Sequence, residues 1–221
     1  GTSAHSFTLL HDSEEDAFAA QVASLGPSTT ILVDTYDIAT GVERAVKAAR
    51  AAGGELGAVR LDSGDLVAEA FKVRAQLDAL GATSTKITVT NDLDEHAIAA
   101  LGAAPVDSYG VGTKLVTGSG RPTAALVYKL VEREGADGTM EEVAKFSSGG
   151  KSTVGGRKWA GRTLTSEWTA AEELVVSSSS QEQGLAALSE AGARPLQVLL
   201  VDEGQIIEEH RGKGALSAAA E

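Results

Sequence analysis

Apolar and polar positions follow one another in blocks along the first half of the chain, and the blocks predict strands followed by helices. The run from Leu56 to Leu61 is short and apolar, which is typical of a buried strand. After it, apolar residues recur at helical spacing from Leu66 to Leu80. Asp65 is placed to cap that helix, and Gly64 supplies the tight turn before it. The pattern therefore predicts a strand–turn–helix unit at the centre of the first half.

Similar units are predicted on both sides of this central one. The expected strands lie at 30–33, at 86–90 and from Val106. One expected helix starts at the Ser13 cap and runs through 17–25, and the others lie at 38–52 and 93–101. Such strand–helix units require a parallel sheet with right-handed crossovers. Because polar residues follow every strand, the pattern favours part of an irregular (β/α) barrel over an open sheet.

The second half predicts a β-rich appendage. Strand-like segments are expected at 124–132 and 142–146, a loop at the serine run 177–180, a hairpin at 196–209 and a frayed alanine-rich tail from Gly214. The predicted domains are therefore residues 1–127, an incomplete α/β barrel with the catalytic site, and residues 128–221, the appendage. The chain opens on Gly1 rather than Met, and only about half of a barrel's strands precede residue 128. We therefore expect a fragment of a longer protein.

Composition excludes several function classes. The net charge of −12 argues against nucleic acid or a membrane surface as partner, because phosphate groups repel an acidic surface. The chain has no cysteine, which excludes disulfides and thiolate chemistry and suits a cytoplasmic protein. No apolar run approaches the roughly 18–20 residues that span a bilayer, and no signal peptide is visible. We expect a cytoplasmic protein.

Charged residues gather where the predicted strands end. The central strand ends in Arg60 and Asp62. Asp34, Asp92 and Asp107 follow other strands. One aspartate after a strand is commonly a turn former or a helix cap. Several at successive strand ends, with an arginine among them, favour a ligand-binding edge, because parallel α/β folds bind ligands there.

Other polar residues are ambiguous by themselves. A lone histidine such as His5 is usually structural. The segment Gly110-Val111-Gly112-Thr113 matches neither the dinucleotide fingerprint nor the P-loop. Its glycines would still let backbone N–H groups approach a phosphate, but the segment fits an ordinary turn equally well. The basic cluster between Lys151 and Arg162 fits solvated surface equally well, and we assign it no function.

Five motifs in a fixed order carry a family resemblance. They are Gly1-Thr2-Ser3-Ala4-His5-Ser6, Leu32-Val33-Asp34-Thr35-Tyr36-Asp37, Arg60-Leu61-Asp62-Ser63-Gly64-Asp65-Leu66, Tyr109-Gly110-Val111-Gly112-Thr113 and Tyr128-Lys129-Leu130-Val131-Glu132. Together they resemble nicotinate phosphoribosyltransferase over most of residues 1–160. The resemblance implies an irregular α/β barrel of the type II phosphoribosyltransferase kind and a homodimer. It also implies that nicotinate and phosphoribosyl pyrophosphate give nicotinate mononucleotide and pyrophosphate in NAD biosynthesis.

The resemblance further implies ATP as co-substrate and roles for individual residues. His5 resembles the histidine that ATP phosphorylates, and its imidazole is expected at a strand end. Thr2 and Arg60 match positions that hold nicotinate, the guanidinium pairing with the carboxylate. Ser6 is expected to help select the acid over the amide. Asp62 resembles the carboxylate that binds the ribose hydroxyls and stabilises an oxocarbenium-like transition state.

The remaining implied residues belong to two loops and to the first strand end. Ser63, Gly64 and Asp65 continue the substrate-binding motif after Asp62. The phosphate-binding loop is expected at Gly110, Gly112 and Thr113, which would cradle the 5′-phosphate through backbone amides. Asp34 and Asp37 are expected to orient His5 or a Mg²⁺ ion that arrives with the pyrophosphate substrate. No metal site made of protein ligands alone is expected.

Two features depart from the family pattern, and two alternatives stay open. The aromatic residue that stacks on nicotinate and further basic residues belong to the family's amino-terminal region, which is absent here. The segment after Lys151 has Gly155-Gly156 where Pro-Gly is usual. One alternative is another phosphate-binding barrel enzyme, such as an isomerase or aldolase, which a lysine at a strand end would favour. The other is a non-catalytic truncated remnant, and even on the main reading residues 1–221 alone are expected to be inactive.

Overall fold

The computed structural model describes residues 1–118, 120, 123–146 and 152–207. The chain forms two compact units. Unit 1 comprises residues 1–133 and 143–154, and unit 2 comprises residues 134–142 and 155–221. Residues 143–154, from the predicted appendage, thus pack with the first half of the chain. The predicted domain division at residue 127 stays a prediction.

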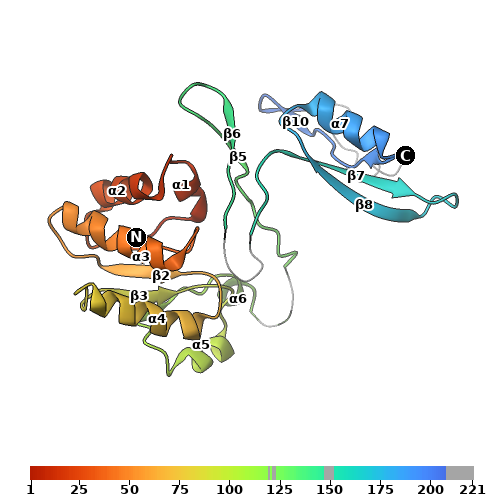
Figure 1. Cartoon of the computed structure of the whole chain (residues 1–221). Helices are drawn as coiled ribbons and strands as arrows, with labels where there is room; N and C mark the ends of the chain where they lie inside the picture. The colour runs from red at the N-terminus through yellow and green to blue at the C-terminus, as the bar shows by residue number, and fades with distance from the viewer. Residues whose placement is uncertain (119, 121–122, 147–151, 208–221) are drawn as a thin grey trace. The chain divides into compact units, whose positions relative to one another are not determined.

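Unit 1 is built on a parallel sheet. Its strands are β1 (Thr30–Leu32), β2 (Ala58–Leu61), β3 (Lys86–Val89) and β4 (Ser108–Tyr109), which lie side by side in chain order (Figure 1). The register pairs Leu32 with Arg60, and Arg60 with Thr88. All the carboxyl ends therefore meet at one edge. The predicted parallel α/β fold is confirmed, whereas a closed barrel stays a prediction.

Helices connect these strands. They are α1 (His5–Leu9), α2 (Glu14–Leu25), α3 (Ile38–Ala51), α4 (Leu66–Ala79), α5 (Glu95–Leu101) and α6 (Thr113–Thr117). The side chain of Ser13 caps α2 and that of Asp65 caps α4, as predicted. Asp37 and Asp94 cap α3 and α5 in the same way. Each cap satisfies a backbone N–H group that has no partner within the helix.

The core of unit 1 lies between the sheet and its helices. Ile31, Val59 and Ile87 come from three adjacent strands and are all fully buried. Val46 of α3 and Val73 of α4 belong to the same cluster. Burial of such side chains contributes about 1.5–3 kcal/mol each, which fixes the strand ends that carry the polar residues. No helix among the described residues is long and apolar enough to cross a membrane.

The start of the chain differs from its prediction. His5 begins α1 and does not end a strand. Ala4 before it is extended, and Thr8 and Leu9 of the helix are buried. A helix of five residues spans too few turns to leave a periodic signal in the sequence, so the expected strand end was wrong.

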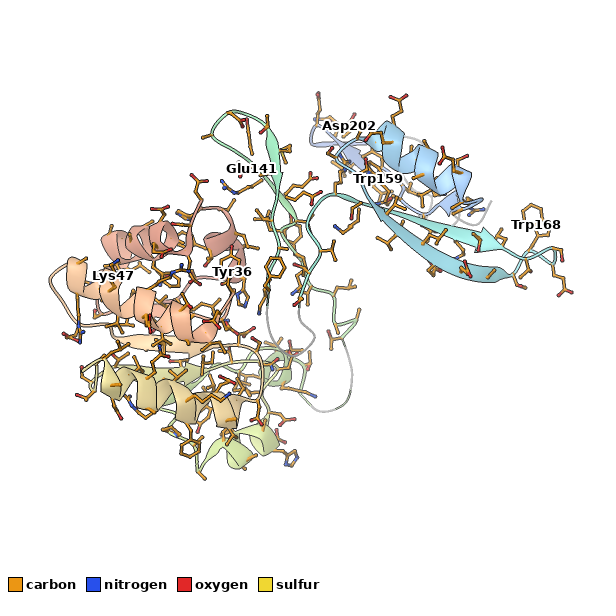
Figure 2. All side chains as sticks on the ribbon, viewed as in Figure 1. Tyr36, Lys47, Glu141, Trp159, Trp168 and Asp202 are labelled. Carbon is orange, nitrogen blue, oxygen red and sulfur yellow. The ribbon has the colours of Figure 1, made fainter. Side chains whose placement is uncertain are left out.

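Unit 2 contains a small antiparallel sheet whose individual strands were not among those predicted. Strands β7 (Lys158–Leu164), β8 (Ala170–Ser177) and β9 (Arg194–Pro195) are arranged as β8-β7-β9, and α7 (Gln181–Glu190) follows β8. Its core consists of Trp159, Leu188 and Ala193. Trp159 is labelled near the start of β7 in Figure 2. A Cβ atom at Gly184 of α7 would lie 2.1 Å from the Trp159 ring, so the close packing requires glycine.

Other described parts of the second half of the chain partly match the prediction. The serine run, expected to be a loop, ends β8 with Ser177 and caps α7 with Ser180. Short hairpins pair β5 (Glu132–Glu134) with β6 (Met140–Glu142), and β10 (Val201–Asp202) with β11 (Gln205–Ile206). The strand-like segments 124–132 and 142–146 are thus mostly wrong in position, whereas a hairpin within 196–209 is confirmed. The tail from Gly214 lies outside the described residues.

Candidate active site

A cavity of about 820 Å³ opens at the carboxyl edge of the parallel sheet in unit 1. It brings together the amino-terminal segment, the ends of β2 and β3 and the loop after β4. Predicted site residues that line it are Thr2, His5, Arg60, Asp62, Gly110, Gly112 and Thr113. Residues as far apart in sequence as Thr2 and Thr113 thus share one cavity, because parallel strands end at the same edge.

Arg60, near the end of β2, is held by three hydrogen bonds. Its Nε donates to Thr90 Oγ1 at 3.0 Å, and its two terminal nitrogens donate to the Ser3 carbonyl at 3.2 Å and to Asp62 Oδ1 at 3.3 Å. The side chain is 20% exposed. A guanidinium has five N–H donors, so these contacts leave two that can serve a bound anion.

Asp62 is fixed by its neighbours on both sides. Its Oδ1 accepts hydrogen bonds from Thr90 and Arg60, and its backbone N–H donates to Asp34 Oδ2 at 2.9 Å. The same Asp34 oxygen accepts the Ser63 hydroxyl at 2.5 Å. Asp34 is 1% exposed and therefore anchors the turn in which Gly64 adopts φ +80°. The loop positions the Asp62 carboxylate before any ligand binds.

His5 lies among three charged groups. Its Nδ1 is 3.0 Å from Thr35 Oγ1, and its Nε2 is 2.8 Å from the Nζ of Lys145. Nε2 also lies 3.8 Å from one carboxylate oxygen each of Asp34 and Asp62. Both ring nitrogens therefore have polar neighbours, and Nε2 faces the cavity-lining residues Asp62 and Lys145.

The loop after β4 approaches the Arg60 site closely at one glycine. A Cβ atom on Gly110 would lie 2.4 Å from Thr90 Cγ2, so the close approach requires glycine there. At Gly112 the same construction meets no atom within 4 Å, which leaves its backbone accessible from the cavity. Asn91 and Asp92 also line the cavity and have positive φ angles of 120° and 48°. Such strained backbone clusters at functional sites.

Other predicted site residues lie outside this cavity. Ser63 and Asp37 line a second cavity of about 530 Å³ on whose wall Asp34 also lies. Asp65 caps α4 by accepting from the Ala68 N–H at 3.1 Å. Ser6 lies in α1, and Gly64 forms the turn. The binding roles implied for these residues stay predictions.

Asp37 has a structural role of its own. Its carboxylate accepts hydrogen bonds from both the hydroxyl and the N–H of Thr40, at 2.7 and 2.8 Å, at the start of α3. These bonds lower the pKa of Asp37 below its usual value of 3.8. Among the described residues, no group of three or more His, Cys, Asp or Glu side chains is placed to hold a metal ion.

Sequence reasoning missed two residues that complete the site. Thr90 bridges Arg60 and Asp62, yet a threonine at a strand end carries no chemical signal. Lys145 contacts His5 but lies 140 residues away from it in the sequence. A strand-end pattern could not have found Lys145, because tertiary packing alone brings it to the sheet edge.

Fold and cavity together define a class of protein. It is a parallel α/β protein whose sheet edge presents an arginine, two lysines, a histidine and carboxylates around one cavity, with a glycine-containing loop beside them. Cationic side chains and glycine loops at such an edge are typical of sites for anionic small molecules.

Comparison with curated proteins narrows this class to one family. Over 183 residues the chain is 56% identical to nicotinate phosphoribosyltransferase pncB1 of Mycobacterium tuberculosis, covering 79% of this chain and 39% of that protein. It is 41% identical over 164 residues to the Bacillus subtilis nicotinate phosphoribosyltransferase, covering 72% and 33%. The chain belongs to the nicotinate phosphoribosyltransferase family, and the resemblance drawn from its motifs is confirmed. It spans about two fifths of the length of the pncB1 protein.

Solved structures agree on the fold. Nicotinate phosphoribosyltransferase from Porphyromonas gingivalis aligns with a TM-score of 0.56 at 21% identity, covering 87% of this chain and 47% of that one. The enzyme from Vibrio cholerae aligns with a TM-score of 0.50 at 22% identity, covering 70% and 40%. No family model matches the chain. At these identities the structures support the α/β fold alone.

Proposed function

We propose that the native protein joins nicotinate to phosphoribosyl pyrophosphate, giving nicotinate mononucleotide and pyrophosphate in NAD biosynthesis. The observation that carries this proposal is the pair Arg60 and Asp62, held 3.3 Å apart at the edge of the cavity that the glycine loop also lines. The two substrates need three groups in one place. Arg60 can bind the carboxylate of nicotinate, Asp62 can contact the sugar, and the glycine loop can bind the phosphate.

Arg60 and Thr2 bind nicotinate in this proposal. Three N–H groups of Arg60 donate to Thr90, Ser3 and Asp62. The other two can form charge-assisted hydrogen bonds to the nicotinate carboxylate. Thr2 lines the same cavity and would contact the ring or the carboxylate. Nicotinamide has no negative charge to pair with a guanidinium, which favours the acid over the amide.

Asp62 acts on the ribose. When the bond from the anomeric carbon to pyrophosphate breaks, positive charge develops on the sugar ring, and a carboxylate fixed beforehand stabilises it without reorganisation. Thr90, Arg60 and the backbone bond to Asp34 supply that fixation. The nitrogen of nicotinate then attacks the anomeric carbon. The 5′-phosphate would lie against the backbone of Gly110, Gly112 and Thr113.

ATP hydrolysis is proposed to drive the step through His5. A lone pair of the neutral imidazole attacks the terminal phosphorus of ATP, an N–P bond forms, and the P–O bond to ADP breaks. The ring gains a positive charge, which the carboxylates of Asp34 and Asp62 at 3.8 Å stabilise. Water later hydrolyses the phosphohistidine. Mg²⁺ would accompany the phosphate groups of both substrates, as it does where carboxylates and phosphates share an ion.

The proposed assembly is larger than this chain. The pncB1 protein is more than twice as long as the part that matches, which leaves room for the remaining strands of a barrel. We propose that the native enzyme closes an irregular barrel, that it is a homodimer as the family resemblance implies, and that it is cytoplasmic, as its lack of cysteine suits. Residues 1–221 alone are proposed to be inactive, because the sheet has four strands among the described residues and a closed (β/α) barrel has eight.

The test is product formation by the native protein. Purified protein receives nicotinate or nicotinamide with phosphoribosyl pyrophosphate, Mg²⁺ and ATP, and chromatography follows the mononucleotides. We expect nicotinate mononucleotide, together with pyrophosphate and ADP, and at least tenfold less product from the amide, as the loss of a charge-assisted bond implies. Absence of product from either base would contradict the proposed reaction. Equal products from both would contradict the role of Arg60.

A further inference from the structure

Lys145 enters the active-site cavity from a segment outside the strand–helix units. It is 4% exposed although it is a lysine. Its backbone N–H donates to Thr153 Oγ1 at 2.9 Å, and its carbonyl accepts from the Thr153 N–H at 3.0 Å. The next residue, Phe146, donates its N–H to the carbonyl of Thr35 at 3.1 Å. Lys145 is therefore held beside the loop after β1, where Thr35 contacts His5.

The contact between Lys145 and His5 determines where the imidazole carries its hydrogen. A lysine ammonium has three donors and no acceptor, so the Nε2 atom at 2.8 Å must be the acceptor. A neutral imidazole with an accepting Nε2 carries its hydrogen on Nδ1. Nδ1 can donate that hydrogen to Thr35 Oγ1 at 3.0 Å, and Thr35 is fully buried. Both contacts agree with one tautomer.

The carboxylates nearby favour the opposite tautomer. Oδ1 of Asp34 has no hydrogen-bond partner among the described residues and lies 3.8 Å from Nε2. Oδ2 of Asp62 lies at the same distance. Both oxygens would accept a hydrogen from Nε2 after a small movement of the ring. Without a donor at the position of Lys145, the hydrogen would therefore move from Nδ1 to Nε2.

We propose that Lys145 is the positioning residue of His5. Its ammonium holds the neutral imidazole in the tautomer protonated at Nδ1, so that the lone pair lies on Nε2, on the side of the cavity. The catalytic consequence rests on the proposed function. The Nε2 lone pair forms the bond to the terminal phosphorus of ATP, the P–O bond to ADP breaks, and the displaced ammonium pairs with the phosphoryl oxygens. The hydrogen on Nδ1 stays with Thr35 during this step.

Nitrogen-15 NMR of the native protein, labelled at histidine, tests the tautomer without any substrate. The chain has four histidines, and the His5 signals are assigned by their loss in His5→Ala. Spectra are recorded at a pH at which the His5 ring is neutral. We expect the pattern of an imidazole protonated at Nδ1. In Lys145→Met we expect the pattern of protonation at Nε2, whereas Lys145→Arg, which keeps a donor, should retain Nδ1. Lys129→Met removes a positive charge from the same cavity without a described contact to His5 and should leave the tautomer unchanged.

The wild-type spectrum alone can overturn the proposal, because protonation at Nε2 would exclude a lysine donor whether or not the variants fold. An unchanged tautomer in folded Lys145→Met would overturn it too. A second readout is the rate at which ³²P from γ-labelled ATP enters the protein, expected to fall about ten- to hundredfold in Lys145→Met and to recover partly in Lys145→Arg. If the tautomer depends on Lys145 and the wild type takes no label, the proposed function fails and the positioning role stands.

Discussion

Thr90 is a small residue on which the geometry of the cavity depends. Its hydroxyl accepts from Arg60 Nε and donates to Asp62 Oδ1, so it joins the cation and the carboxylate. Gly110 packs against its methyl group, where no Cβ atom fits. One threonine therefore couples the groups proposed to bind nicotinate, ribose and phosphate.

Substitution of Arg60 tests the recognition of the acid. Arg60→Ala should weaken nicotinate binding about ten- to hundredfold, since it removes charge-assisted hydrogen bonds. Arg60→Lys should recover only part of this affinity, because an ammonium lacks the planar fork of a guanidinium. Calorimetric titration of the native protein gives the affinities, and nicotinamide is the control ligand. Unchanged nicotinate affinity in folded Arg60→Ala would assign Arg60 to the sugar phosphate or to the fold.

Substitution of His5 tests the coupling to ATP. In His5→Ala the native protein should no longer incorporate phosphate from γ-labelled ATP, whereas the wild type should carry an acid-labile, base-stable label. Some synthesis without ATP should persist, because Arg60 and Asp62 stay in place. His11→Ala is a matched control, since His11 does not line the cavity and its Nδ1 lies 2.8 Å from the carbonyl oxygen of Phe7, four residues earlier. Equal labelling of His5→Ala would exclude His5 as the phosphoryl acceptor.

At the scale of elements, the strand–helix units of unit 1 and the hairpin within 196–209 were predictable, whereas most of the other elements of the second half were not. Apolar runs and capping residues such as Ser13 and Asp65 act locally, so the sequence contains the signal. The contacts of Lys145 with His5 and of Trp159 with Gly184 depend on packing between distant segments. Hydrophobic periodicity contains no information about such pairs. Arg60 and Asp62 could be assigned to the sheet edge from the sequence because they lie where a predicted strand ends. Lys145 could not be assigned there, because only tertiary packing brings it to His5.

The cap of α3 gives a prediction with a defined dependence on pH. Asp37→Ala should lower the free energy of unfolding by about 1 kcal/mol at pH 7, the usual cost of losing an aspartate cap, and Asp37→Asn should cost little. Hydrogen bonds from Thr40 lower the Asp37 pKa, so this stabilisation is present above 3.8 and is lost as the pH falls through the folded-state pKa. The difference between wild type and Asp37→Ala should therefore shrink below pH 3.8.

Chemical denaturation at pH 7 and at pH 3 measures this difference, with Asp37→Asn as the control for loss of charge. If Asp37 acts only as the cap of α3, its replacement should change the free energy of unfolding and not the binding of substrate. If Asp37→Ala instead left stability unchanged and weakened Mg²⁺-dependent binding of phosphoribosyl pyrophosphate, Asp37 would serve the ion, as the resemblance allowed.

At the scale of the whole molecule, the described sheet is only part of what the proposed reaction needs. Leu126 and Tyr128 of unit 1 are 90% and 88% exposed, and large side chains exposed this close together are typical of a surface that another chain segment covers. We therefore expect residues 1–221 produced alone to associate and to form no mononucleotide. Size-exclusion chromatography and the product assay check both. A monomer that unfolds cooperatively and turns over nicotinate would contradict the need for further chain.

The most direct measurement is the rate of nicotinate mononucleotide formation by the native protein with Asp62→Asn. This substitution keeps the shape of the side chain and removes the charge proposed to stabilise the transition state. Asp94→Asn is the matched control, an aspartate that caps α5 and does not line the cavity. We predict a loss of about a hundredfold or more for Asp62→Asn, in line with the removal of one transition-state contact, and a wild-type rate for Asp94→Asn. Equal rates in wild type and Asp62→Asn would contradict the proposed site.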